Sequence, residues 1–272
     1  MSNNVQSSYG ASPATAIAGQ LADSGVCDVR SVIAEAAITS ALAVIRGATT
    51  KAEGKHPGAP DTADVDAIIA TIASAATAQT ITSLDGVVGG AEMFPPRNVT
   101  LTLSNHANWD LTIARVTGTD EDGRIITEEL VIPDGGNATV TGVKTFRTVT
   151  SLYIPAQSGT SGTATMGFGS VLGPIGGQGV HGIAMYDASG KPEAYPVDYA
   201  VPVLRRGRIY VTAEAAVDVG QPVYVRFVAT GDEKLGAMRA APDANDCALL
   251  NGARWASKTT GAGLAVVELN LP

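Results

Sequence analysis

The stretch Val201–Phe227, VPVLRRGRIYVTAEAAVDVGQPVYVRF, decides the fold class of this chain. Two runs rich in β-branched and apolar residues, Val201–Leu204 and Arg208–Thr212, flank a predicted tight turn at residues 205–207. In Pro222–Phe227 apolar and polar side chains alternate, which places the apolar ones on one face of a strand. The stretch therefore predicts short strands of a barrel or jelly roll.

The same kind of pattern extends to other parts of the chain. In Val99–Ser104 valine and leucine alternate with threonine and serine, as in a half-buried antiparallel strand. A hairpin is predicted from Leu111–Thr117 to Arg124–Ile132, with its turn at Asp120–Gly123. Further strands are predicted at Ala138–Thr141, Phe146–Ile154, Thr163–Phe168 and Leu264–Leu269, the last with Ala265, Val267 and Leu269 facing inward.

The composition agrees with an all-β class. The 272 residues include 31 glycines and 14 prolines and only 16% charged residues, which indicates short strands joined by many turns. A chain of this length is more typical of two packed units than of one. Because only 5% of the residues are aromatic, we expect cores made mainly of valine, isoleucine, leucine and alanine.

Charge and hydropathy exclude several classes of partner. The net charge of −8 argues against nucleic acid, because such binding depends on lysine and arginine neutralising phosphates. No apolar run approaches the ~18 residues that span a bilayer, and the first 25 residues lack the pattern of a signal peptide. We therefore expect synthesis in the cytoplasm, no export by a signal of its own, and no membrane partner.

The N-terminal part combines an arm, two strands and one helix. Residues 1–26 are small and polar, which predicts an extended arm that orders only against a partner or the body. Cys27–Arg46 fits either a short helix or two strands with a turn at Thr39-Ser40, and we favour the strands. Residues 61–72 predict one short amphipathic helix, because apolar residues recur there at helical spacing, at Val65, Ile68, Ile69 and Ile72.

A glycine-rich joint divides the chain into two units. Leu172–Gly179, LGPIGGQG, has five glycines or prolines in eight residues. We expect a jelly-roll or β-barrel-like body built from residues 1–72 and 174–272, with residues 73–173 inserted as a small protruding β-sandwich. Such an insertion is tolerated where the ends of the host loop lie close together, since lengthening a surface loop costs little entropy.

Motifs of nucleotide and cation binding are weak here. Gly177, Gly179 and Gly182 match the spacing of a dinucleotide fingerprint, but the predicted strand that follows them cannot replace the helix which that motif requires. Asp120, Asp122 and Gly123 resemble part of a calcium loop, yet a hairpin turn explains them equally well. We expect no cofactor and no metal.

The remaining reactive residue types also favour structural roles. The three histidines lie in different segments without metal-ligand spacing, and they are interpreted as surface or capped residues. Cys27 and Cys247 are interpreted as two small buried thiols rather than a disulfide. Glu128 and Glu129 are expected on opposite faces of an exposed or edge strand, where they cannot share a proton. Without a nucleophile and base, we expect no enzyme.

Several segments resemble the structural cement, or capsid decoration, family of bacteriophages. They cover roughly residues 1–50 and 178–272 and include Tyr9–Pro13, Ala18–Gly25, Val203–Val211, Val219–Val225 and Gly252–Trp255. The middle part is similar to a separate module of phage structural proteins, at Pro95–Val99, Val116–Asp120 and Phe146–Ser151.

The resemblance implies a jelly-roll-like body bound to the outside of an assembled capsid, where it bridges capsomers and stabilises the shell. The partners would be the major capsid protein and further copies of this chain, as a dimer or trimer. The candidate capsid or subunit contacts are Tyr9, Pro13, Leu21, Arg205, Arg206, Arg254 and Trp255. An alternative is a virion surface module whose inserted domain binds a host receptor or glycan, and a β-fold hydrolase is a weaker third hypothesis.

Overall fold

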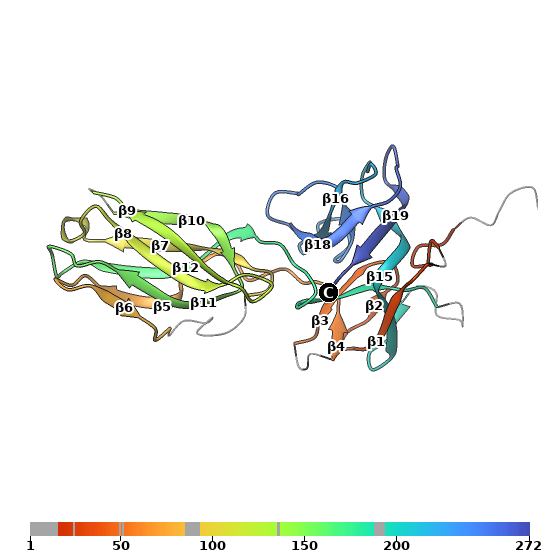
Figure 1. Cartoon of the computed structure of the whole chain (residues 1–272), viewed down its shortest axis with the longest axis horizontal. Helices are drawn as coiled ribbons and strands as arrows, with labels where there is room; N and C mark the ends of the chain where they lie inside the picture. Colours follow the sequence, from red (N-terminus) through yellow and green to blue (C-terminus); the bar gives the residue numbers. More distant parts are fainter. Residues whose placement is uncertain are drawn as a thin grey trace, which may run out of the picture.

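The computed structural model describes residues 16–23, 25–48, 50, 52–84, 93–134, 137–187 and 194–272. Its described part contains nineteen strands and one short 3-10 helix, η1 (His106–Asn108), which confirms the all-β prediction. Figure 1 shows two units side by side along the longest axis, a sandwich and a body. Within the described residues, no helix is long and apolar enough to cross a membrane.

The body is a nine-stranded sheet that closes on itself. The strand order is β1-β4-β3-β13-β15-β17-β16-β18-β19, and the additional pairings of β15 with β1 and with β19 close two rings that share β15. A separate small sheet pairs β2 (Ile38–Thr39) with β14 (Ala194–Tyr195). The strands of the large sheet are β1 (Asp28–Ala34), β3 (Ala43–Arg46), β4 (Glu53–Lys55), β13 (Val180–Ala184), β15 (Ala200–Ala213), β16 (Pro222–Arg226), β17 (Met238–Arg239), β18 (Cys247–Trp255) and β19 (Gly263–Asn270).

Strand β15 corrects the turn predicted at residues 205–207. It runs for 14 residues without interruption and is the strand that both rings use. Its first half pairs with β1 from Ala200 to Arg206, and its second half pairs with β19 from Arg206 to Ala213. Gly207 has φ +123°, a value that glycine adopts readily, so the backbone can change direction here while the strand continues.

The body core is aliphatic, as the low aromatic content predicts. Val223 and Val225 of β16 and Phe227, which follows this strand directly, are buried in one cluster with residues from β15, β18 and β19. Ala265, Val267 and Leu269 of β19 point into the same cluster, which confirms the predicted inward face of the last strand. The alternation of side chains along these strands therefore sets which face of each is buried.

The sandwich consists of two four-stranded sheets. One has the order β10-β7-β12-β5 and the other β6-β11-β8-β9, and their inner faces share one hydrophobic cluster. The predicted hairpin is confirmed as β8 and β9, which pair antiparallel across their whole length. The strands are β5 (Asp64–Ala73), β6 (Gln79–Ile81), β7 (Arg97–Ser104), β8 (Thr112–Thr119), β9 (Ile125–Ile132), β10 (Ala138–Phe146), β11 (Thr148–Ile154) and β12 (Thr163–Leu172).

The helix predicted at residues 61–72 is wrong, because this segment is strand β5. It pairs with β12, and the register shifts twice, between Ala164 and Met166 and between Met166 and Phe168. These irregularities change which side chains face inward, so residues 67–69 are buried in succession and mimic a helical repeat. The pairing places residues 64–72 in the sandwich sheet, so the proposed insertion would begin before Asp64 instead of at Ala73.

The two strands favoured for Cys27–Arg46 are confirmed as β1 and β3, with the short β2 between them. The interpretation of both cysteines as buried thiols is half wrong. Cys247 is buried in the body, and this burial raises the pKa of its thiol to about 11. Cys27 is exposed immediately before β1, and both cysteines are free thiols.

A polar joint connects the sandwich to the body at the turn of the β8–β9 hairpin. Arg147 donates from Nη1 to the carbonyl of Glu121 (3.0 Å) and to Oε1 of Gln178 (3.2 Å). Gln178 in turn donates to the carbonyl of Asp122 (3.0 Å). The linker is also held to the body, because the backbone N–H of Ile175 donates to the carbonyl of Leu249 (2.8 Å). The hairpin turn is therefore fastened to the linker that enters the body.

Candidate interaction surface

Three arginines lie on the outer face of the body, two of them paired with Glu268 and the third, Arg206, donating to Oδ1 of Asn270 (3.0 Å). Arg206 and Arg208 are two residues apart on β15, so both side chains point outward, and β19 places Asn270 and Glu268 opposite them. Arg208 donates from Nε to Glu268 at 2.9 Å. Arg254 of β18 lies opposite Glu268 from the other side and pairs with the same carboxylate.

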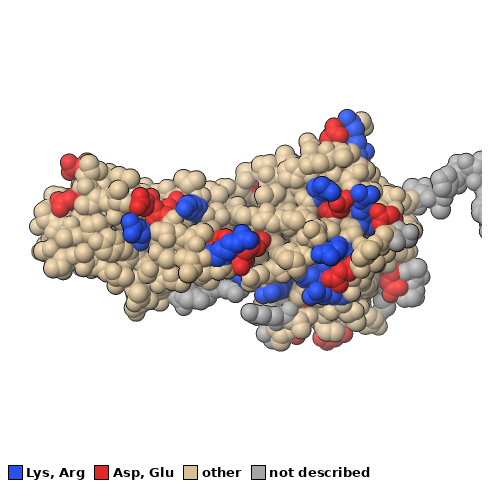
Figure 2. All heavy atoms as spheres, viewed as in Figure 1, with Lys and Arg blue, Asp and Glu red and all other residues tan. Residues whose placement is uncertain are grey.

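We call this set, Arg206, Arg208, Arg254 and Glu268, the arginine face. The hydrogen bond from Arg208, followed by that from Arg254, lowers the pKa of Glu268, so this carboxylate is charged at neutral pH. Asp23 also lies 3.6 Å from Arg208, so three guanidinium groups and two carboxylates leave a small positive excess here on a chain that is acidic overall. Figure 2 shows several such places on the body where lysine and arginine lie beside aspartate and glutamate.

The end of the N-terminal arm runs along the arginine face. Gly19 donates to the carbonyl of Tyr210 (2.7 Å), Tyr210 donates to that of Gln20 (2.9 Å), and Ala22 donates to that of Arg208 (2.8 Å). Leu21 forms a bridge with Ile209 and packs partly buried on the body core. The arm therefore extends the sheet beside β15 before β1 begins.

Two of the candidate contact residues lie inside the body instead. Arg205 is 6% exposed and Trp255 is fully buried in the core, so neither side chain can lie on an outer contact surface. Arg205 donates to the main-chain oxygen of Pro272, the last residue of the chain, which Figure 1 marks among the strands of the body. The alternation along β15 and β18 explains the split, because neighbours in sequence point to opposite faces.

The other candidate contacts divide between the arginine face and undescribed residues. Arg206 and Arg254 lie on the arginine face, and Leu21 lies next to it. Tyr9 and Pro13 fall outside the described residues. The contacts predicted from the sequence did not include Arg208 or Glu268. In a strand, however, the two-residue spacing of Arg206 and Arg208 in RRGR places both side chains on the same face of the sheet.

A buried ion network stabilises the hairpin region after β15. The side chain of Arg226 is 1% exposed and contacts three carboxylates, those of Glu214 (2.7 Å), Glu233 (2.9 Å) and Asp243 (3.0 Å). The hydrogen bond to Glu214 is the first cause that raises the pKa of Arg226, so this residue stays charged despite its burial. The network is a fully paired buried charge, which fits a structural role.

The motifs considered for catalysis have structural explanations. The Asp120 side chain accepts from the backbone of Asp122 and Arg124, as in a hairpin turn. Glu129 is exposed and pairs with Arg115 at 3.3 Å, as expected for an edge strand. Glu128 is buried, contrary to expectation, because its Oε1 accepts from the backbone of Val143 (2.6 Å) in the facing sheet.

Two of the three histidines, His56 and His181, contact the backbone in the body. Nε2 of His56 accepts from Thr39 (2.7 Å), and burial lowers the pKa of His56, so this imidazole is neutral. His181 lies 2.9 Å from the carbonyl of Glu53. Among the described residues, no group of three or more histidine, cysteine, aspartate or glutamate side chains could hold a metal ion.

Comparison with known families identifies the class of this protein. Residues 131–270 match the family described as Structural cement protein (E217 gp24/Pam3 gp6), which is just over half of the chain. The chain therefore belongs to this family of phage structural cement proteins. The matched segment begins in β9 of the sandwich and ends in β19 of the body, so it includes strands of both units. No curated protein matches the chain.

Membership in this family has direct consequences for function. Structural cement proteins are a structural and non-enzymatic kind of protein, and the family is associated with the phage capsid. The chain is accordingly a virion structural protein with a role in capsid stabilisation. Three buried charged side chains have structural contacts, since Glu128 binds the backbone of the facing sheet, Arg147 fastens the joint and Arg226 centres an ion network.

Proposed function

We propose that this protein decorates the exterior of the assembled phage head, where it bridges neighbouring capsomers and stabilises the shell. The observation that carries the proposal is the match to the structural cement family across strands of both units. In this function each copy adds buried surface between capsomers, and that surface must be lost before they separate. An interface of ~1,600 Å² suffices for stable attachment, and repetition over the lattice multiplies the effect.

The arginine face and the arm beside it are the proposed contact with the major capsid protein. Arginine suits this role because its planar guanidinium binds carboxylates in a fixed geometry and contacts flat surfaces well. The arm runs along β15 at residues 19–22, so it lies beside the arginine face. An extended segment that orders on its partner covers a large surface with few residues.

The proposed architecture has a discontinuous body on the shell and the sandwich protruding from it. The two units have separate hydrophobic clusters, which supports this division. The chain leaves the body after β4 and returns to it at β13, so the whole sandwich lies between two strands of the body. A dimer or trimer of the chain would place several sandwiches around one contact.

Binding to undecorated heads tests the proposed function. Purified protein is mixed with such heads, and the particles are imaged by electron microscopy. We expect regular density on the outside of the shell with the wild-type chain and its loss after deletion of residues 1–15, which leaves the pairing of residues 19–22 with β15 intact. Absence of external density with the wild-type chain would contradict the proposal.

A second candidate function, recognition of a host receptor or glycan, would belong to the far end of the sandwich. The turn between β8 and β9 faces the body, so the opposite ends of these strands lie away from it. Three apolar side chains are exposed there: Leu111 (66%), Ile113 (47%) and Val131 (55%). A glycan array probed with the full chain tests this candidate function. Absence of binding to every glycan on the array would exclude glycan recognition.

A further inference from the structure

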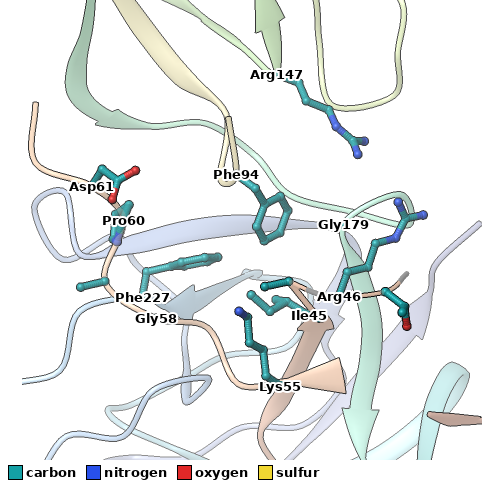
Figure 3. A pocket seen from close by; sticks show the side chains of 14 residues that line it. Ile45, Arg46, Lys55, Gly58, Pro60, Asp61, Phe94, Arg147, Gly179 and Phe227 are labelled. Atoms are coloured by element: carbon teal, nitrogen blue, oxygen red, sulfur yellow. The ribbon is translucent and has the colours of Figure 1, made fainter. Parts of the chain in front are cut away.

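The joint between the sandwich and the body contains an open cleft of about 560 Å³. Phe94 and Arg147 lie on its sandwich wall, and Ile45 and Phe227 lie on its body wall, as Figure 3 shows. The rings of Phe94 and Phe227, with centroids 6.0 Å apart, form an apolar contact across the joint. A joint with an open cleft loses fewer packed contacts when it moves than a filled core would.

The chain passes from the sandwich to the body within two residues of the linker. The backbone N–H of Gly173 donates to the carbonyl of Pro96, directly before β7 of the sandwich (2.7 Å). The N–H of Ile175 donates to the carbonyl of Leu249 in the body (2.8 Å). Pro174 therefore marks the boundary between the units. A swing of the sandwich must occur about this point and about the first connection, residues 56–63 between β4 and β5.

Glu121 is a buried carboxyl group where the sandwich contacts the linker and the body. It lies in the turn between β8 and β9, is 7% exposed, and forms a side-chain hydrogen bond with Asn251 of β18 in the body. On the linker side it lies against Gly176, where a Cβ would be 2.0 Å from its Oε1. Sandwich, linker and body together enclose this carboxyl, so a swing of the sandwich away from the linker would expose it to water.

The charges that act on Glu121 come from the sandwich itself. Burial, followed by the charges of Asp122 and Asp120 in the same turn, raises the pKa of Glu121, and the charge of Arg147 lowers it. Asp122 is itself paired with the exposed Arg124 at 3.1 Å. The partner of Glu121 in the body is an uncharged amide, which stabilises an ionised carboxylate less than a cation would.

We propose that ionisation of Glu121 loosens the joint, so that the sandwich is held against the body at acidic pH and swings away from it at alkaline pH. In the closed joint, ionisation places a charge in an enclosed space opposite an uncharged amide. In the open joint the carboxyl reaches water, which removes burial, the main cause of its raised pKa. The inference goes beyond the proposed function, since the motion belongs to the chain whether or not it is attached to a shell.

The direction of the effect follows from the protons bound in each state. Below pH 4.5 the carboxyl is protonated in both states, and above pH 7 it is ionised in both. Between these values the closed joint keeps a proton that the open joint releases, so the open state gains as pH rises. Each pKa unit is a factor of ten, so the closed-to-open ratio falls at most about 300-fold. Asp120 and Asp122 stay beside Glu121 after opening, so we expect about tenfold to hundredfold.

Single-molecule fluorescence energy transfer between one dye on each unit of the full chain tests the proposal. The dyes are attached to Cys27, which is exposed in the body, and to Val143→Cys, at a position 87% exposed on β10 of the sandwich. Cys247 is buried, and burial raises the pKa of its thiol, so it should remain unlabelled. We expect one population at pH 5 and a second one, with a different transfer efficiency, whose ratio to the first is at least about tenfold higher at pH 8.

Glu121→Gln should keep the closed population at both pH values, because the glutamine amide is uncharged and can still bind Asn251. The matched control is Glu129→Gln, whose carboxylate is exposed on the same hairpin, and it should behave like the parent. An unchanged population ratio in the parent between pH 5 and 8, or the same increase in Glu121→Gln, would overturn the proposal. Circular dichroism of the same samples should not change, and a loss of strand signal at pH 8 would show unfolding in place of a swing.

Discussion

The substitution Glu121→Gln should change how the stability of this protein depends on pH. Glu121 lies in the turn of the β8–β9 hairpin at the joint with the body, and it is 7% exposed. Burial, followed by the charge of Asp122, raises the pKa of its carboxyl from 4.5 to about 7, although a hydrogen bond from Asn251 and the charge of Arg147 act in the opposite direction.

The sign follows from the protons bound in each state. Between pH 4.5 and 7 the folded chain keeps the Glu121 proton that the unfolded chain has lost, so the free energy of unfolding decreases as pH rises. Below pH 4.5 both states are protonated, and above pH 7 both are ionised. Each pKa unit corresponds to 1.36 kcal/mol, so the destabilisation at pH 8 is at most about 3 kcal/mol. Glutamine has the same shape without the charge, so Glu121→Gln should recover ~1–3 kcal/mol of unfolding free energy at pH 8.

Urea unfolding at pH 4.5, 6 and 8, followed by tryptophan fluorescence, measures the effect. Trp109 is buried in the sandwich and Trp255 in the body, so a Trp255→Phe background reports the sandwich alone. We expect Glu121→Gln to flatten the decline of stability between pH 4.5 and 8. The control is Glu129→Gln, whose carboxylate is exposed on the same hairpin. A variant that is less stable than the parent at pH 8, or an unchanged pH slope, would refute the reasoning.

Three further predictions concern the folded units. Arg226→Met should destabilise the body by about 1–3 kcal/mol, because it removes the charged hydrogen bonds of a buried guanidinium and leaves Glu214 and Asp243 with Arg239 alone, whereas the exposed Arg115→Met should change the denaturation midpoint little. Gly167→Ala should destabilise the sandwich by ~1–3 kcal/mol or more in thermal unfolding, since its Cβ would lie 1.8 Å from the carbonyl of Asp64; an unchanged melting temperature would contradict this. Residues 62–174 expressed alone should unfold cooperatively in calorimetry, and a disordered product would argue against the proposed insertion.

The local pattern of the sequence was sufficient for most strands of this protein. The hairpin at residues 112–132 was predictable because an acidic turn with glycine separates two apolar runs. The inward face of β19 was predictable because its side chains alternate with a period of two. The resemblance of the chain to phage cement proteins was also readable from short motifs, and the family match confirms it.

The candidate site was only partly predictable. The two arginines at Arg205 and Arg206 suggested a turn with both side chains exposed. Strand β15 continues through them, so one is buried and the other joins the arginine face. The joint between the units could not be predicted at all, because Arg147 and Gln178 belong to the sandwich and the linker and meet only where the sandwich contacts the body.

The sequence by itself determined the β class, the positions of most strands and the family, because these depend on side-chain alternation, turn residues and short motifs. Only the tertiary structure decided that residues 64–73 form a strand, since the register shifts against β12 arise from a partner a hundred residues away. It also decided which charges lie together, as on the arginine face, where three separate strands contribute. Local preferences act over a few residues, whereas strand pairing and domain contacts join groups that are distant along the chain.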